Sequence, residues 1–157
     1  LVLDDIPMYA AGKRARIGVT ITTPDETVAR LWEPHASPVA RRVEVLRRAK
    51  EEGLATSVMF GPLLPGVSDD EKTLDELMKI ARDLDVDLIW TDALNPRPKV
   101  WPAVQALLAK VNPALVEPYR GILFNGARRE KYLEGLRRRI SNAAEHNKVA
   151  SKLGGCP

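Results

Sequence analysis

Three short apolar segments, each followed by a turn and then by a helical pattern, narrow the range of folds open to this chain more than any other feature. They cover residues 16–22, 55–60 and 86–91, and each is rich in β-branched or other strand-forming side chains. Their starts lie 30 to 40 residues apart, which is the spacing of strand–helix repeats in a parallel sheet. The pattern predicts an α/β fold, either an open doubly wound sheet or part of a (β/α) barrel.

Helices are predicted between and after these strands. Capping patterns and apolar stripes predict helix starts at residues 23–26, 37–38 and 68–71, the second of these helices ending at Gly53. Further helices are expected over residues 1–11, 99–110 and 128–146. Residues after Asn147 are expected to fray.

Composition bounds the class of protein. A length of 157 residues with 45% hydrophobic and 29% charged residues suits one globular domain. No apolar run reaches the 18 residues of a membrane span, and no signal-peptide core opens the sequence, so a cytoplasmic protein is expected. Aromatic residues make up only 5% of the chain, which argues against a base-stacking surface for nucleic acid.

Charge is unevenly placed along the chain. Residues 119–157 hold nine Lys/Arg against three acidic residues, a balance of +6, whereas residues 1–118 hold 15 basic and 18 acidic residues, a balance of −3. We therefore separate residues 1–118 from a basic helical extension at 119–157. Such an extension can attract phosphate backbones, so DNA is a possible partner. A solvated helix face is the simpler interpretation, because the arginines are not interleaved with aromatic residues.

The usual catalytic and metal-binding motifs are absent from the sequence. The single Cys156 excludes an internal disulfide and a multi-cysteine metal or iron–sulfur site built from this chain alone. His35 and His146 lack metal-ligand spacing and are expected at the surface. No G-x-G-x-x-G, Walker A or H-E-x-x-H pattern occurs, and no Ser-His-Asp arrangement is recognised. Neither a catalytic residue nor a metal ligand is assigned.

Two loops after the predicted strands are candidate binding loops, because ligands of parallel α/β folds meet the carboxyl ends of the strands. Residues 61–69 form either a stiff apolar shelf for a flat ligand or a tight strand-to-helix turn. After the third strand, Asp92, Asn95 and Arg97 lie in a proline-braced loop. They form either a site or a network that satisfies local backbone groups.

A third candidate is the segment between the first two predicted helices. Glu33 is followed eight and nine residues later by Arg41 and Arg42. An ion pair that pins the loop is the favoured interpretation, and recognition of a ligand carboxylate by one of the arginines is the alternative.

Several of these segments together resemble the radical S-adenosylmethionine superfamily, and within it the spore-photoproduct-lyase-like group often labelled DNA repair photolyases. The resembling residues are 1–6, 17–23, 31–34, 37–38, 41–42, 61–69 and 92–98. The resemblance implies a partial (β/α)6 TIM-like barrel. A C-x-x-x-C-x-x-C loop after its first strand binds a 4Fe–4S cluster, the cluster binds S-adenosylmethionine, and a 5′-deoxyadenosyl radical takes a hydrogen atom from the substrate, a thymine dimer in the lyase branch.

This sequence lacks the cysteine loop, so the resemblance implies that the chain is the C-terminal half of such an enzyme. It would supply strands four to six and be inactive without the cluster-binding half. By resemblance, Thr20 and Thr22 would face the ribose or amino-acid part of the cofactor. Leu63, Leu64 and Gly66 would border its adenine.

Asp92 and Asn95 would, by the same resemblance, lie on the substrate or adenine side of the last strand. A half barrel also leaves its inner face uncovered, and we expect that face to include alternate residues of 17–21 and 58–60. The expected partner is the missing N-terminal half, or else a second copy of the chain.

Two other functions stay open on the sequence. One is a free-standing α/β module that binds nucleic acid through its basic C-terminal helix. The other is a cluster-independent enzyme that uses Asp92 and Asn95, although no base or nucleophile accompanies them.

Overall fold

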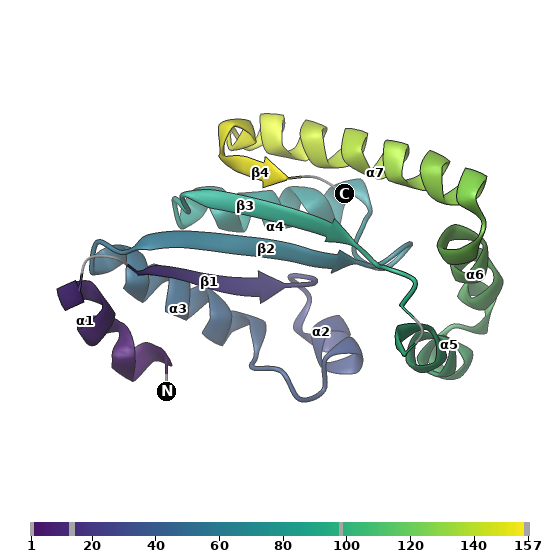
Figure 1. Cartoon of the computed structure of the whole chain (residues 1–157), viewed down its shortest axis with the longest axis horizontal. Helices are drawn as coiled ribbons and strands as arrows, with labels where there is room; N and C mark the ends of the chain where they lie inside the picture. Colours follow the sequence, from purple (N-terminus) through teal and green to yellow (C-terminus); the bar gives the residue numbers. More distant parts are fainter. Residues whose placement is uncertain (1, 13–14, 98, 156–157) are drawn as a thin grey trace.

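The chain folds around a four-stranded parallel sheet (Figure 1). The computed structural model describes residues 2–12, 15–97 and 99–155. The strands lie in chain order, and each pairs in parallel with the next: β1 (Arg16–Ile21), β2 (Ala55–Leu63), β3 (Leu88–Ala93) and β4 (Leu153–Gly155). The predicted α/β class with a parallel sheet is confirmed.

Seven α-helices accompany the sheet in the described ranges. They are α1 (Val2–Gly12), α2 (Glu26–Trp32), α3 (Val39–Glu51), α4 (Glu71–Asp83), α5 (Val100–Val111), α6 (Val116–Phe124) and α7 (Gly126–His146). Short 3-10 helices cover Pro113–Leu115 and Ala150–Lys152. None of these helices is long and apolar enough to cross a bilayer. Of the seven, α6 was not predicted.

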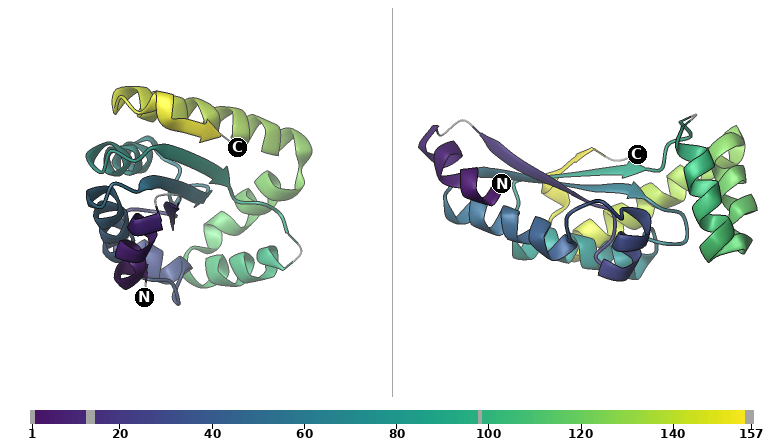
Figure 2. Two further views of the ribbon diagram at one scale, coloured as in Figure 1. Left: turned by 60° about the vertical axis from the view of Figure 1, so that its left-hand side comes forward. Right: turned by 90° about the horizontal axis from the view of Figure 1, so that it is seen from below.

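The main core lies between one face of the sheet and helices α3, α4 and α7 (Figure 2). Ile21, Val58, Phe60 and Ile89 are buried on that face, because side chains alternate between the two faces of a strand. The helical side of the core comes from Leu46, Leu74, Leu77, Leu136 and Ile140. A doubly wound sheet has helices on both faces, so this sheet is wound differently.

The opposite face of the sheet is open in the described structure. Its central row is Thr20, Met59 and Trp90, which are register partners across β1, β2 and β3. Met59 and Trp90 are 40% and 42% exposed. Below them lie Gly18, Ser57 and Leu88. We call these six residues the open face.

The sequence left open which alternate residues of 17–21 and 58–60 face outward. Ile17 and Ile21, like Val58 and Phe60, are buried beneath helices, so Gly18, Thr20 and Met59 are the ones that face outward. Apolar runs with little polar alternation do not fix which face is covered. Packing against the helices decides it here.

The strand boundaries also differ from those predicted. β2 continues through Gly61 and Pro62 to Leu63, which pairs with Ala93 after an irregular register. β3 begins two residues late because Val86 still closes α4, its N–H donating to the oxygen of Ala81. Past Asn147 the chain is ordered into β4 rather than frayed, with Val149 only 2% exposed.

Helix starts follow side-chain caps that the sequence placed one or two residues away. Asp25 caps α2 by accepting from the N–H groups of Thr27 and Val28, so Thr23 is not the N-cap. Asp70, not Ser68, caps α4 through the N–H of Thr73. These shifts leave the predicted helices in place.

Candidate functional site

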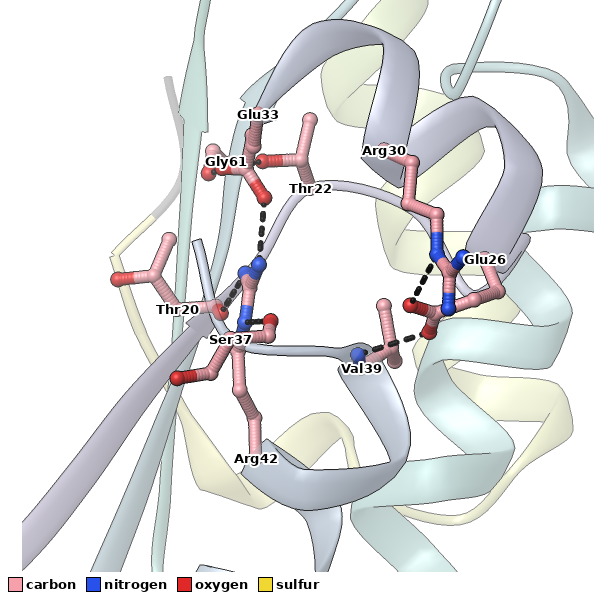
Figure 3. A network of polar contacts seen from close by, with 9 residues as sticks. All are labelled: Thr20, Thr22, Glu26, Arg30, Glu33, Ser37, Val39, Arg42 and Gly61. Atoms are coloured by element: carbon pink, nitrogen blue, oxygen red, sulfur yellow. Dashed lines mark hydrogen bonds and ion pairs between the residues drawn. The ribbon is translucent and has the colours of Figure 1, made fainter. Parts of the chain in front are cut away.

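The carboxyl ends of β1, β2 and β3 lie side by side at one end of the sheet (Figure 1). The β1 end is held by a network centred on Arg42 (Figure 3). Arg42 donates from Nε to the oxygen of Ser37 at 2.7 Å, from Nη1 to the oxygen of Thr20 at 2.8 Å, and from Nη2 to Glu33 at 2.9 Å. All three of its nitrogens are therefore engaged, and the predicted ion pair is between Glu33 and Arg42 rather than Arg41.

Glu33 extends this network to the end of β2. Its second carboxylate oxygen lies 2.8 Å from the hydroxyl of Thr22, and the same hydroxyl lies 3.1 Å from the backbone oxygen of Gly61. Arg42 and Glu33 are only 12% and 24% exposed in their side chains, so the pair is shielded from water. It joins β1, α2, α3 and β2 at one point.

A neighbouring contact fixes the start of α3. Glu26 accepts from the N–H of Val39 at 2.9 Å (Figure 3), which supplies the cap that Pro38 cannot provide from its own side chain. The α2 helix thus holds both ends of the loop that leads to α3.

The two threonines expected at the cofactor have different settings. Thr20 is exposed on the open face, while Thr22 is 2% exposed and engaged by Glu33 and Gly61. Thr20 is available to a ligand. Thr22 acts as a structural link between two strand ends.

The residues expected to border the adenine are also divided. Leu63 and Leu64 are 0% and 2% exposed and belong to two hydrophobic clusters, so neither presents its side chain to a ligand. Gly66 is exposed, with φ at +67°, a conformation that favours glycine. It borders a shallow groove of about 340 Å³ beside Trp32 and Leu115.

The segment at 61–69 has the hydrogen bonding of a tight turn. The hydroxyl of Ser68 accepts from the N–H of Leu64 at 3.0 Å, and the carboxylate of Asp69 accepts from the N–H of Gly66 at 2.7 Å. The turn interpretation therefore describes this loop better than an open apolar shelf.

Asp69 also anchors α7, a role that its sequence position did not indicate. Its side chain is 8% exposed, and its backbone and carboxylate oxygens accept from Arg139 at 2.8 and 3.0 Å. Burial and the nearby Asp69 charge raise the pKa of both Tyr119 and Tyr132 well above the usual value. Both phenols therefore resist ionisation even in alkaline solution.

At the end of β3, Asp92 and Asn95 come together. The amide nitrogen of Asn95 donates to Asp92 at 3.2 Å, and the amide oxygen of Asn95 accepts from Arg129 at 3.0 Å. Arg129 also donates to the oxygen of Leu94 at 3.2 Å. Arg129 on α7 thus fixes the orientation of Asn95, a contact that no sequence pattern indicates. Arg97 is exposed, and its side chain has no described part in this cluster.

Close packing brings Asp92 against β2. A Cβ added to Gly61 would lie 3.1 Å from the backbone oxygen of Asp92. Thr20 and Asp92 lie two strands apart, and Asp92 follows Trp90, the residue in register with Thr20, by two residues. This corresponds to about 12 Å between them. Of the seven expected cofactor positions, Asp92 and Asn95 are in contact and partly exposed, Thr20 and Gly66 are exposed apart from them, and three are buried.

The described part of the chain gathers no three His, Cys, Asp or Glu side chains able to hold a metal ion. Cys156 lies outside the described residues. His35 is exposed as expected. His146 is also exposed, and its Nδ1 lies 2.5 Å from the carboxylate of Asp75.

These features define a parallel α/β unit with helices on one sheet face and polar side chains at its strand ends. No family model matches the chain. The chain is similar to "Uncharacterized protein ORF301" of Acidianus two-tailed virus, with 35% identity over 112 residues. The match covers 69% of this chain and 37% of the viral protein. Since 112 residues are 37% of it, the viral protein is about 300 residues long, and the chain matches little more than a third of its length.

Proposed function

We propose that this chain is the C-terminal half of a radical S-adenosylmethionine enzyme of the spore-photoproduct-lyase-like group. In this proposal it supplies the last strands of a partial (β/α)6 barrel, and its strand ends contact the cofactor and the substrate. The observation that carries the proposal is the winding of the sheet. Three parallel strands follow one another in chain order, and their connecting helices all pack on one face.

This winding is what a segment of a (β/α) barrel requires. In such a barrel every helix lies outside, and the inner sheet face is turned toward the strands opposite. The open face, with half-exposed Met59 and Trp90, corresponds to that inner surface. A free-standing globular unit would normally bury such apolar side chains.

The residues fit the proposed cofactor in part. Thr20, Asp92 and Asn95 offer hydroxyl, carboxylate and amide groups at accessible strand ends, suited to the hydroxyl and amino groups of S-adenosylmethionine. Leu63 and Leu64 do not fit direct contact, because both are buried.

The described residues do not fit an iron–sulfur cluster, which needs several cysteine ligands. In this proposal the cluster belongs to residues outside this chain. When bound at such a cluster, the cofactor supplies the radical chemistry of the superfamily. The residues of this chain bind and orient the cofactor and the substrate.

Asp92 is the residue whose setting best suits that role. Asn95, itself held by Arg129, donates to the carboxylate of Asp92, and Asp92 is only partly buried. At the other end of the row, Arg42 and Glu33 hold the end of β1, and thereby Thr20, in place. Rigid support of this kind positions a binding group without adding chemistry.

The basic C-terminal helix supports a nucleic-acid-binding module less well. Arg129 and Arg139 turn inward to Leu94, Asn95 and Asp69. Among the exposed basic residues of α7 stand the exposed acids Glu134 and Glu145. The stripe presented to a phosphate backbone is thus weaker than the +6 balance suggests.

The proposal is tested first on the encoding reading frame and then by cofactor binding. We expect a C-x-x-x-C-x-x-C segment upstream in the same frame, and its absence would overturn the proposal. In the protein from the whole frame, Asp92→Asn and Thr20→Val should each weaken S-adenosylmethionine binding about tenfold, the loss of one hydrogen bond to a charged or polar group. Glu52→Gln, an exposed carboxylate at the end of α3, is the matched control and should leave binding unchanged.

A further inference from the structure

The two edges of the sheet differ in their capacity to accept another strand. β4 has three residues and ends the sheet on one side, whereas β1 presents six residues with no neighbour among the described residues. Short edge strands discourage further pairing, and long regular ones invite it. The β1 edge is therefore the one suited to a partner.

The row of helices points to the same edge. α3, α4 and α7 each connect two adjacent strands, and α1 continues this row on the far side of α3, beyond β1 (Figure 1). Ile6 of α1 is buried against Ala49 of α3 and Leu54. Because strand–helix–strand connections are right-handed, a helix in that place belongs to a strand lying next to β1.

A groove lies beside the β1 edge where such a strand would pack. It measures about 550 Å³ and is lined by Leu3, Val19, Pro38 and Val45, among others. Its apolar lining suits the helix-facing side chains of a strand. Arg41 lines the same groove with an exposed side chain, which favours an acidic residue in the partner.

Arg42 limits where pairing can occur. It donates to the backbone oxygen of Thr20, so that oxygen points away from β2 and is already occupied. In a β-strand the N–H and C=O of one residue point to the same side, and those of the next residue point to the opposite side. The backbone N–H and C=O of Arg16 and Gly18 therefore point, like those of Thr20, toward the free edge of β1. A partner strand can therefore hydrogen-bond to the backbone of Arg16 and Gly18, but not to the oxygen of Thr20, which Arg42 already occupies.

We propose that the β1 edge binds a parallel β-strand from outside the described residues, with apolar side chains in the groove between α1 and α3. Its pairing ends at Thr20, where Arg42 takes the last edge carbonyl. The inference rests on the proposed function only in supposing that the strand belongs to the other half of the barrel. The free β1 edge, the groove beside it and the position of α1 indicate a partner strand, whatever chemistry the other half of the barrel performs.

The test tethers a strand to this chain. A copy of residues 55–60, a segment that pairs in parallel with β1 from the other side, is joined upstream of α1 through a glycine–serine linker. We expect amide hydrogen exchange at Gly18 to slow at least about tenfold and the thermal midpoint to rise. The matched control carries prolines in place of the copied Val58 and Phe60 and should change neither.

Two results would overturn the inference. One is a Gly18 amide that exchanges as slowly as that of Val19 in the monomeric chain without the tether, since the edge would then be occupied already. The other is unchanged exchange in the tethered chain. No cluster or cofactor enters this experiment. A protected edge in a protein that forms no 5′-deoxyadenosine would therefore reject the proposed function and leave the strand inference standing.

Discussion

Arg139 on α7 donates to both the backbone and the carboxylate oxygens of Asp69, at 2.8 and 3.0 Å, and so joins the last long helix to the turn after β2. Asp69 is nearly fully buried. We predict that Arg139→Ala lowers the free energy of unfolding by about 3 kcal/mol, because it leaves a buried carboxylate without its cationic partner. Urea denaturation measures this loss, and the exposed neighbour Arg138→Ala should change stability by no more than about 0.5 kcal/mol.

The same contact changes how nucleic-acid binding should be tested. Because Arg139 pairs with the buried Asp69, neutralising Arg137, Arg138 and Arg139 together would destabilise the fold as well as remove positive charge. Neutralising Arg138 together with Lys131, both exposed on α7, isolates the charge effect. We predict little change in salt-dependent DNA binding, and a steep loss of affinity would favour the nucleic-acid-binding module instead.

The Arg42 network predicts a second asymmetry between neighbouring arginines. Arg42→Ala removes three hydrogen bonds at the end of β1 and should lower the free energy of unfolding by about 2 kcal/mol. Arg41→Ala should be close to neutral, since that side chain is exposed. Equal effects of the two substitutions in thermal or chemical denaturation would contradict the assignment of the ion pair to Arg42.

Two glycines on neighbouring strands should respond differently to a methyl group. At Gly61 the new Cβ would meet the backbone of Asp92 at 3.1 Å, which cannot move without separating β2 from β3. Gly61→Ala should cost about 2 kcal/mol. At Gly18 the Cβ would lie 2.8 Å from the hydroxyl of Ser57, which can rotate away, and 3.6 Å from the backbone oxygen of Ser57, an ordinary contact. Gly18→Ala is therefore the milder change. Circular dichroism melting curves distinguish the two, and a larger effect at Gly18 would contradict the packing described.

Acid should weaken the fold through Asp87. Partial burial raises the pKa of this carboxyl, but hydrogen bonds from Lys50 and Thr56 outweigh burial and lower it overall. A lowered native pKa means that the unfolded chain binds the proton more readily. The stabilisation is therefore complete above the ordinary value of 3.8 and is lost as the pH falls below it.

Asp87→Asn should accordingly lower stability at neutral pH and flatten the fall in unfolding free energy between about pH 5 and pH 3. Glu52→Gln, an exposed carboxylate at the end of α3, is the control. An Asp87→Asn curve that runs parallel to that of the unmodified chain would show that this carboxyl does not carry the acid sensitivity.

Much of the fold could be predicted because strand and helix periods are strong in this sequence. The segments rich in β-branched residues predicted β1 and β2, and the apolar stripe of Leu74, Leu77 and Met78 predicted α4. β4 was not predicted, because two of its three residues are Gly154 and Gly155, and glycine does not favour a strand. Gly154 is needed there, since a Cβ would lie 2.6 Å from Leu88 and 3.2 Å from Trp90.

The site was harder to predict because its supports are distant in sequence. Glu33 and Arg42 are close along the chain, and their pairing could be narrowed to two arginines. Arg129 and Arg139 reach partners 34 and 70 residues away. The helical pattern shows only that an arginine such as Arg129 lies off the solvent-facing side of the helix. It does not show which loop that arginine contacts. Likewise, burial of Leu63 and Leu64 depends on α5, α6 and α7 folding back over the strand ends.

In the proposed function, these strand ends serve a radical S-adenosylmethionine enzyme. The most direct measurement is the formation of 5′-deoxyadenosine by the protein from the complete reading frame, reconstituted anaerobically with iron and sulfide and given a reductant and S-adenosylmethionine. We predict that 5′-deoxyadenosine forms, and that Asp92→Asn lowers the rate of its formation while Glu52→Gln does not. A protein that carries a reduced cluster yet releases no 5′-deoxyadenosine would contradict the account.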